Sequence, residues 1–415
     1  VLYTLRAQID TTQGQTPFVK SFFESFQPLD TCLGVDLYSD KIQPFFFDRI
    51  YSKDTLIRKQ AFEAMEYVIG NLLDNQAPQT IKFIEHPEFK DLPYSDKQRF
   101  LIGLGRLKHD AVLPFYEKLY RSYADSSGLQ LAILRGVARQ RTEKSMKLFL
   151  KLLQTDLPVS SKTDEIERIF NTYHDTLELG ARLFPELLRY TKFPEYKTPV
   201  YHLMSELVMK GHLKPAQYKK FKSDILSDAN YDLKIYLTSE GNEYRYYSRK
   251  FRSKGELGPE NTLDEEQLKI FGYAVLLSPF HKEADVKKYL DKIQRTPKHD
   301  LKIVLSAYYA KRNVPVMDSV WTFYAKKPDT RALLFASAEY FDVKKVFPAT
   351  YSSQEMISIG VLYSGQKDAE KDTIVLLQRI ENNNLSGGGY VYLFKYRAKD
   401  KRVWQIRRAS CRERV

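Results

Sequence analysis

The residue pair with the most evident catalytic potential is His109–Asp110, in the stretch GLGRLKHDAVLPFYEKLYRSY. A histidine and an aspartate form a catalytic dyad when the two side chains face each other. Neighbouring residues of a helix point about 100° apart, so this pair cannot form that hydrogen bond within one helix. Asp110 instead suits an N-cap or a first turn, where a carboxylate accepts from free backbone N–H groups. We interpret the pair as part of a polar turn.

The other histidines and the glycine runs contain no catalytic or metal-binding motif. His174–Asp175 and His299–Asp300 repeat the adjacency, but neither has the second histidine four residues along that a zinc-binding helix requires. Gly103–Gly105 and Gly387–Gly389 are not followed by the Lys-Ser/Thr of a phosphate-binding loop. The single histidines are scattered: His86, His202, His212 and His281. We therefore expect no catalytic residue, no metal and no cofactor.

The segments that hold His109 form an internal repeat. Leu101–Tyr120 aligns with Leu134–Leu153 at a constant offset and without a gap. In each copy a polar turn separates two helical patterns, and Tyr116 falls on Phe149 in the second pattern. One helix pair cannot bury its apolar stripe alone, whereas stacked pairs bury a continuous core. The spacing predicts a mainly α fold, a HEAT-like α-helical repeat solenoid, although other families with a 33-residue period fit it too.

Changes in periodicity divide the rest of the chain. Residues 1–38 contain a strand-like start and the amphipathic stretch FVKSFFESF, which together resemble the end of a truncated α+β domain. Helical repeats are predicted for residues 39–240 and 263–343. Residues 344–406 contain KDTIVLLQRI, YVYLFKYRAKD and RVWQI, which predict a small antiparallel β meander. The middle strand is apolar on both faces, so we expect it to be buried.

The two ends of the chain look incomplete or foreign. The chain begins at Val1, and VLYTLRAQID alternates like a strand instead of showing a signal core, so we expect a truncated N-terminus. Residues 407–415 include RASCRERV, which has no apolar period and resembles a translated sequencing adapter. We expect this tail to be non-native. Without it Cys32 is the sole cysteine, which excludes an intrachain disulfide and a cysteine metal cluster.

Residues 241–262, GNEYRYYSRKFRSKGELGPENT, form the predicted linker because they carry glycines, a proline and no sustained period. Basic side chains interleaved with aromatic ones can neutralise phosphates and stack on bases. Nearby acidic residues and the absence of a recognition motif favour a solvated connector over a nucleic-acid site. The candidate surface-contact residues are Arg245, Tyr246, Tyr247, Arg249, Lys250, Arg252 and Lys254.

Limited proteolysis should cut first between Gly241 and Thr262 and leave two stable fragments. Basic, irregular backbone is more accessible to a protease than packed repeat helices. Mass spectrometry of the early fragments checks this expectation. A first cut within residues 101–153 would contradict the predicted boundary.

The composition bounds the possible functions. Among 415 residues, 43% are hydrophobic and 28% are charged, values typical of ordinary globular chains and not of disordered ones. No run of about 18 apolar residues could span a bilayer. The net charge of +13 is basic, but an anionic membrane surface and a nucleic acid would use the same charges, and neither has further support.

The order of several segments resembles the C-terminal helical region of long Bacteroidota proteins of the TraB/GumN family. The similar segments are FFESFQPLD, LRGVARQRTEKSMKLFLKLL, LFPELLRYTKFPEYKTPVYHLM, YAVLLSPF and YVYLFKYRAKDKRVWQI, which together cover nearly the whole chain except the tail. The glycine-histidine and glutamate motifs of the TraB/GumN domain itself, which support metal-dependent hydrolysis in that family, are not recognisable here. The resemblance implies that this domain preceded the present chain, in the cell envelope or periplasm.

Two functions follow from these observations. The first is a non-catalytic helical repeat scaffold that binds a protein partner or the missing N-terminal domain of its own polypeptide. The alternative is the accessory region of a TraB/GumN-like metal-dependent hydrolase whose catalytic domain is missing. The full reading frame would separate the two, because glycine-histidine motifs and a signal peptide upstream favour the alternative, whereas a methionine just before Val1 removes it.

Overall fold

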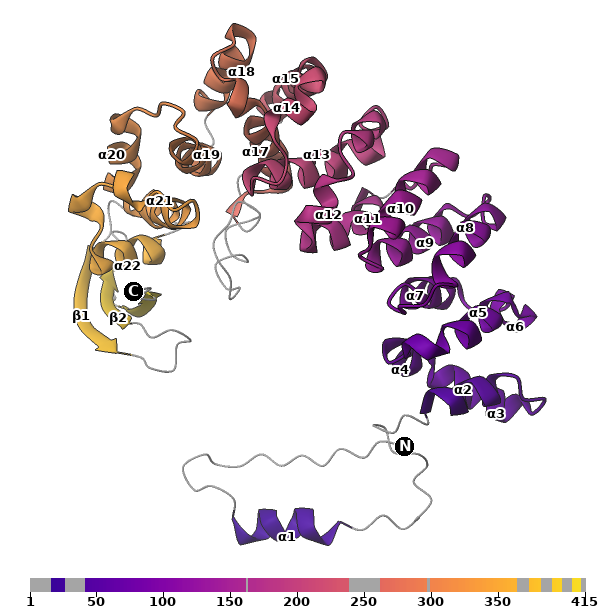
Figure 1. Cartoon of the computed structure of the whole chain (residues 1–415). Helices are drawn as coiled ribbons and strands as arrows, with labels where there is room; N and C mark the ends of the chain where they lie inside the picture. The colour runs from indigo at the N-terminus through magenta and orange to yellow at the C-terminus, as the bar shows by residue number, and fades with distance from the viewer. Residues whose placement is uncertain are drawn as a thin grey trace. The chain divides into compact units, whose positions relative to one another are not determined.

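The computed structural model describes residues 16–26, 42–161, 163–238, 262–296, 299–363, 373–381, 390–397 and 405–411 (Figure 1). The chain is mainly α-helical, with a small antiparallel sheet near its C-terminus, as the sequence predicts. It divides into two compact units, Val1–Val159 and Ser160–Val415. Within the described ranges, none of the helices combines the length and the apolar character that a transmembrane helix needs.

The described part of the first unit contains short helices, and those from Ile42 onward follow one another through short connections. Helix α1 forms at FVKSFFESF as predicted, capped by the Thr16 hydroxyl, whereas the expected strand VLYTLRAQID lies outside the described residues. The helices of this unit are α1 (Pro17–Ser25), α2 (Ile42–Ile50), α3 (Thr55–Glu63), α4 (Met65–Gly70), α5 (Ala77–Glu85), α6 (Pro87–Lys90), α7 (Tyr94–Leu104), α8 (Val112–Ser122), α9 (Ser127–Arg139) and α10 (Glu143–Thr155).

The repeat period of the sequence is present in the helices. Helix α9 begins at Ser127, which aligns with Tyr94 at the start of α7, and α10 ends at Thr155, which aligns with Ser122 at the end of α8. The pair α4–α5 extends the pattern by one copy. Three aromatic side chains at this spacing are fully buried on the second helix of each pair: Phe83, Tyr116 and Phe149. The same stripe therefore packs inward in all three copies.

The turns between the helices also repeat and bind one another. Asp74, Leu107 and Gln140 occupy equivalent positions of the three copies, each after the first helix of a pair. The Lys108 backbone N–H donates to Asp74 Oδ1 at 2.7 Å. The buried Gln140 side-chain amide donates to the carbonyls of Leu107 at 2.7 Å and Gly105 at 3.0 Å. Each turn is therefore hydrogen-bonded to the turn of the next copy.

The turn at His109 and Asp110 is confirmed, but the predicted capping role of Asp110 is wrong. Helix α8 begins at Val112 with Ala111 as its N-cap, and no side chain caps it. Both His109 and Asp110 are exposed, and His109 Nδ1 accepts from the Ala111 backbone N–H at 3.2 Å. The turn is longer than the helical period indicates, so Asp110 lies before the cap position.

The second unit contains a row of helices, each packed on the next: α11, α13, α17, α19, α21 and α22. Figure 1 shows the other helices of the unit beside this row. The bounds are α11 (Thr163–Asp175), α12 (Leu177–Ala181), α13 (Pro194–Met209), α14 (Pro215–Tyr218), α15 (Lys222–Thr238), α17 (Glu265–Leu277), α18 (Ala284–Gln294), α19 (His299–Lys311), α20 (Asp318–Lys326), α21 (Pro328–Tyr340) and α22 (Gln354–Tyr363).

The sheet has the order β1 (Thr373–Glu381), β2 (Tyr390–Arg397), β3 (Gln405–Cys411), and both pairings are antiparallel. One face of β2 is buried against α22, where Phe394 is fully covered. The expectation that β2 is buried on both faces is wrong, because Val391 and Leu393 on the opposite face are only half-buried.

The third strand lies further along the chain than predicted. RVWQI was expected to form it and residues 407–415 to lie outside the fold, yet β3 pairs with β2 from Gln405 to Cys411. The ladder uses backbone groups, which pair without an apolar side-chain period. Strand β3 therefore includes part of the segment that the sequence analysis set aside.

Candidate functional site

The seven surface-contact residues predicted from the sequence, Arg245, Tyr246, Tyr247, Arg249, Lys250, Arg252 and Lys254, lie outside the described residues. Their role therefore stays a prediction. Within the described ranges, no group of three or more histidine, cysteine, aspartate or glutamate side chains could hold a metal ion.

His174, which precedes Asp175 in the sequence, and His202, one of the scattered single histidines, meet between α11 and α13. His174 Nδ1 lies 2.5 Å from Glu206 Oε2, and His202 Nδ1 lies 2.8 Å from Glu167 Oε1. Each helix therefore supplies one histidine and one glutamate. The two imidazole rings are 5.0 Å apart between centroids. The Asp175 next to His174 is not its hydrogen-bonding partner in this pair, which agrees with our rejection of adjacent His–Asp dyads.

Both glutamates of these pairs have a lowered pKa. For Glu167 the largest cause is the hydrogen bond from His202. For Glu206, burial alone would raise the pKa, but the hydrogen bond from His174 and the nearby charges of His174, His202 and Lys210 outweigh it. A lowered pKa means that folding favours the carboxylate form, so the pairs stabilise the contact between α11 and α13.

We expect Glu206→Gln to destabilise the protein more at pH 7 than at pH 3.5. The folded pKa of Glu206 is lowered, so its stabilisation is present above the ordinary glutamate pKa of about 4.3 and is lost as the pH falls below it. Urea unfolding of the variant and the parent protein at both pH values measures the difference. An equal loss at both values would contradict a stabilising role of the ionised pair.

A second set of polar contacts attaches α15 to α13. Asp228 of α15 accepts from Lys197 at 2.6 Å and from the Tyr201 hydroxyl at 3.0 Å. Lys197 and Tyr201 are four residues apart on α13, so they lie on one helix face. Burial, and after it the negative charge of Asp228, raises the pKa of Tyr201. The hydroxyl therefore stays protonated and donates a structural hydrogen bond.

The same arrangement occurs between α15 and α17. Asp232, nine-tenths buried, accepts from the Tyr273 hydroxyl at 2.7 Å and lies 2.9 Å from Lys269 Nζ. Burial first, and then the hydrogen bond to Asp232, raises the pKa of Tyr273. The sequence analysis missed both sets, although the Lys-x-x-x-Tyr spacing at Lys197–Tyr201 and Lys269–Tyr273 was a visible signal. These groups hold three helices together.

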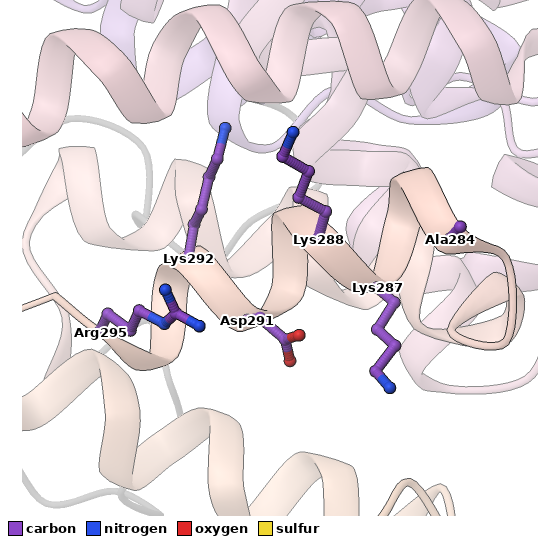
Figure 2. Close-up of a pocket in the computed structure, with 6 residues that line it drawn as sticks. All are labelled: Ala284, Lys287, Lys288, Asp291, Lys292 and Arg295. Carbon is purple, nitrogen blue, oxygen red and sulfur yellow. The ribbon is translucent and has the colours of Figure 1, made fainter.

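The outward face of α18 carries a concentration of positive charge around a shallow hollow of about 310 Å³ (Figure 2). Its apolar side chains point inward, where Tyr289 and Ile293 are buried. Figure 2 shows Lys288 and Lys292 pointing to one side of the helix and Lys287 and Asp291 to the other. The lining residues are all exposed: Ala284, Lys287, Lys288, Asp291, Lys292 and Arg295. We call this surface the α18 face.

The α18 face was not singled out in the sequence analysis, which placed the basic surface in the linker. The signal was present as K-K-x-x-D-K-x-x-R, which puts all five charged residues on the side of the helix opposite Val286, Tyr289, Leu290 and Ile293.

No family model, curated protein or solved structure matches the chain.

Proposed function

We propose that this chain is a non-catalytic helical repeat scaffold, with HEAT-like helix pairs, that binds a protein partner. The observation that carries the proposal is the regular repetition of buried aromatics and hydrogen-bonded turns, because a stack of like units provides an extended surface for binding. The buried and half-buried histidine, glutamate, tyrosine, aspartate and lysine side chains described above support the same function, because they connect helices to one another. The His–Glu and Tyr–Asp–Lys contacts join one helix to another.

A cross-linking experiment tests the scaffold. The full chain, tagged and expressed in its source organism, is treated with a lysine-reactive cross-linker, and cross-linked peptides are identified by mass spectrometry. We expect one partner to be linked to outward lysines of the helix pairs and to form a defined complex with the purified chain. A chain that elutes alone and forms no such complex at micromolar concentrations would contradict the proposal.

The purified chain should also be inactive as a metal-dependent hydrolase. Within the described residues no ligand cluster is available to bind and activate a water molecule. Elemental analysis for zinc, manganese and iron, together with a peptidase assay with and without a chelator, checks this prediction. A stoichiometric metal with chelator-sensitive peptidase activity would favour the hydrolase alternative in place of the scaffold.

A further inference from the structure

The α18 face concentrates charge that the rest of the described chain does not neutralise. Lys287, Lys288, Lys292 and Arg295 form no ion pair with a described residue, and Asp291 is the one carboxylate among them in the hollow. Lys288 and Lys292 are four residues apart, a spacing at which like charges repel. Lys287 lies in the first turn, where the helix dipole disfavours a cation.

Several outward basic side chains on comparable helices have acidic partners. Helix α8 carries Lys118, paired with Glu85 at 2.8 Å, and Arg121, paired with Glu117 at 2.9 Å. On α10, Lys147 pairs with Glu143 at 3.0 Å and Lys151 with Glu117 at 2.7 Å. Other exposed lysines, such as Lys144 on α10, form no ion pair with a described residue. On α18, four basic side chains that form no ion pair with a described residue gather around one hollow, where they are available to carboxylates of another molecule.

We propose that the α18 face binds an acidic helical segment of the partner protein, a proposal that rests on the scaffold function. Lys288 and Lys292 are spaced to meet carboxylates on successive turns of a second helix. Asp291 lines the same hollow and points with Lys287 to the other side of the helix (Figure 2), where it pairs with a cation on the same partner segment. The partner is therefore acidic overall with one basic side chain near the centre of its contact.

The same features favour a protein over a nucleic acid. A phosphate backbone is uniformly negative, so the Asp291 carboxylate among the lining residues opposes it. Single-stranded nucleic acids bind with aromatic side chains that stack on the bases, and no aromatic residue lines the hollow. An acidic peptide needs only the charges that are present.

Fluorescence anisotropy with defined probes tests the proposal on the full chain. The first probe is a labelled alanine-based helical peptide with glutamates four residues apart and one central lysine; the second has glutamine in place of each glutamate, and the third is oligothymidylate. We expect the acidic peptide to bind in low salt, the glutamine peptide to bind at least about tenfold more weakly, and oligothymidylate to bind more weakly than the acidic peptide.

Charge-reversed variants locate the site. Lys288→Glu/Lys292→Glu should lower the affinity for the acidic peptide at least about tenfold. The matched control, Lys234→Glu/Lys345→Glu, changes two exposed lysines that form no ion pair with a described residue, and the affinity should stay within about twofold of the parent. Asp291→Ala should weaken binding of the acidic peptide, whose central lysine loses its carboxylate partner. A further peptide with glutamate in place of the central lysine should bind this variant more tightly than it binds the parent chain.

Several results would overturn the α18 site. An equal loss in the control variant would mean that the net charge of the chain, and not this face, attracts the peptide. Tighter binding of oligothymidylate, lost in the same variant, would replace the protein partner with a nucleic acid. A cross-linked partner that binds Lys288→Glu/Lys292→Glu as tightly as the parent leaves the scaffold in place and overturns the α18 site alone. The acidic peptide could bind the α18 face of a chain that also shows chelator-sensitive hydrolase activity. That result would support the α18 site and contradict the non-catalytic scaffold.

Discussion

Tyr116→Ala should lower the free energy of unfolding by about 3 to 5 kcal/mol, and Phe149→Ala by a similar amount. Both rings are fully buried at equivalent positions of successive helix pairs, so truncation leaves a large cavity in the core of the first unit. Tyr116 also donates a hydrogen bond from its hydroxyl to the carbonyl of Leu101 on the neighbouring helix α7. Urea unfolding of the full chain, followed by far-UV circular dichroism, measures both changes.

Two further variants separate the causes of this loss. Tyr116→Phe keeps the ring and removes the hydrogen bond to Leu101, so we expect a cost of about 1 kcal/mol. His109→Ala removes an exposed side chain in the turn and should change stability by less than about 0.5 kcal/mol. A loss from His109→Ala as large as that from Tyr116→Ala would mean that the repeat alignment is wrong.

Gly105→Ala should cost about 3 kcal/mol, although it adds only one methyl group. Helices α7 and α9 approach so closely that a Cβ at Gly105 would collide with the Gly136 carbonyl oxygen and lie 2.5 Å from Gly136 Cα. The colliding atoms belong to the backbone, so relief requires the two helices to move apart and breaks the contact between neighbouring repeats. The same unfolding measurement applies.

Gly70→Ala is the matched control for this prediction. Gly70 lies at the C-terminal end of α4, as Gly105 caps the C-terminal end of α7, but apart from its chain neighbours and the backbone of α4 no atom lies within 4 Å of a Cβ placed there. Alanine also restricts the unfolded chain more than glycine does, so Gly70→Ala should be neutral or stabilising by up to about 1 kcal/mol. Similar destabilisation in both variants would argue against close helix packing as the cause.

The sequence by itself determined the helical architecture of the first unit. The constant offset of the repeat alignment placed Tyr116 and Phe149 at equivalent buried positions and located the turn at His109. The sequence also placed helix α1 and the small C-terminal sheet. These features follow from local periodicity, because the spacing of apolar residues along one segment decides which face of a helix or strand packs inward.

Only the tertiary structure decided which polar side chains meet. His174 and His202 lie far apart in the sequence and give no motif, yet packing of α11 on α13 pairs each with a glutamate of the other helix. The same holds for Asp232, whose partners Lys269 and Tyr273 lie beyond the linker. Such pairs depend on the rotation and register of two helices, which the pattern of either helix alone does not specify.

The limits of local patterns also explain the corrected predictions. Asp110 was assigned as a cap from its residue type, but the backbone of the turn places Ala111 at that position. Strand β3 was ended at Ile406 because its apolar pattern stops there, whereas backbone pairing with Tyr390 continues it to Cys411. The charge of α18 was visible in the sequence, but only the packed helices show that its basic side chains form no ion pair with a described residue, because ion pairing depends on distance in space and not along the chain.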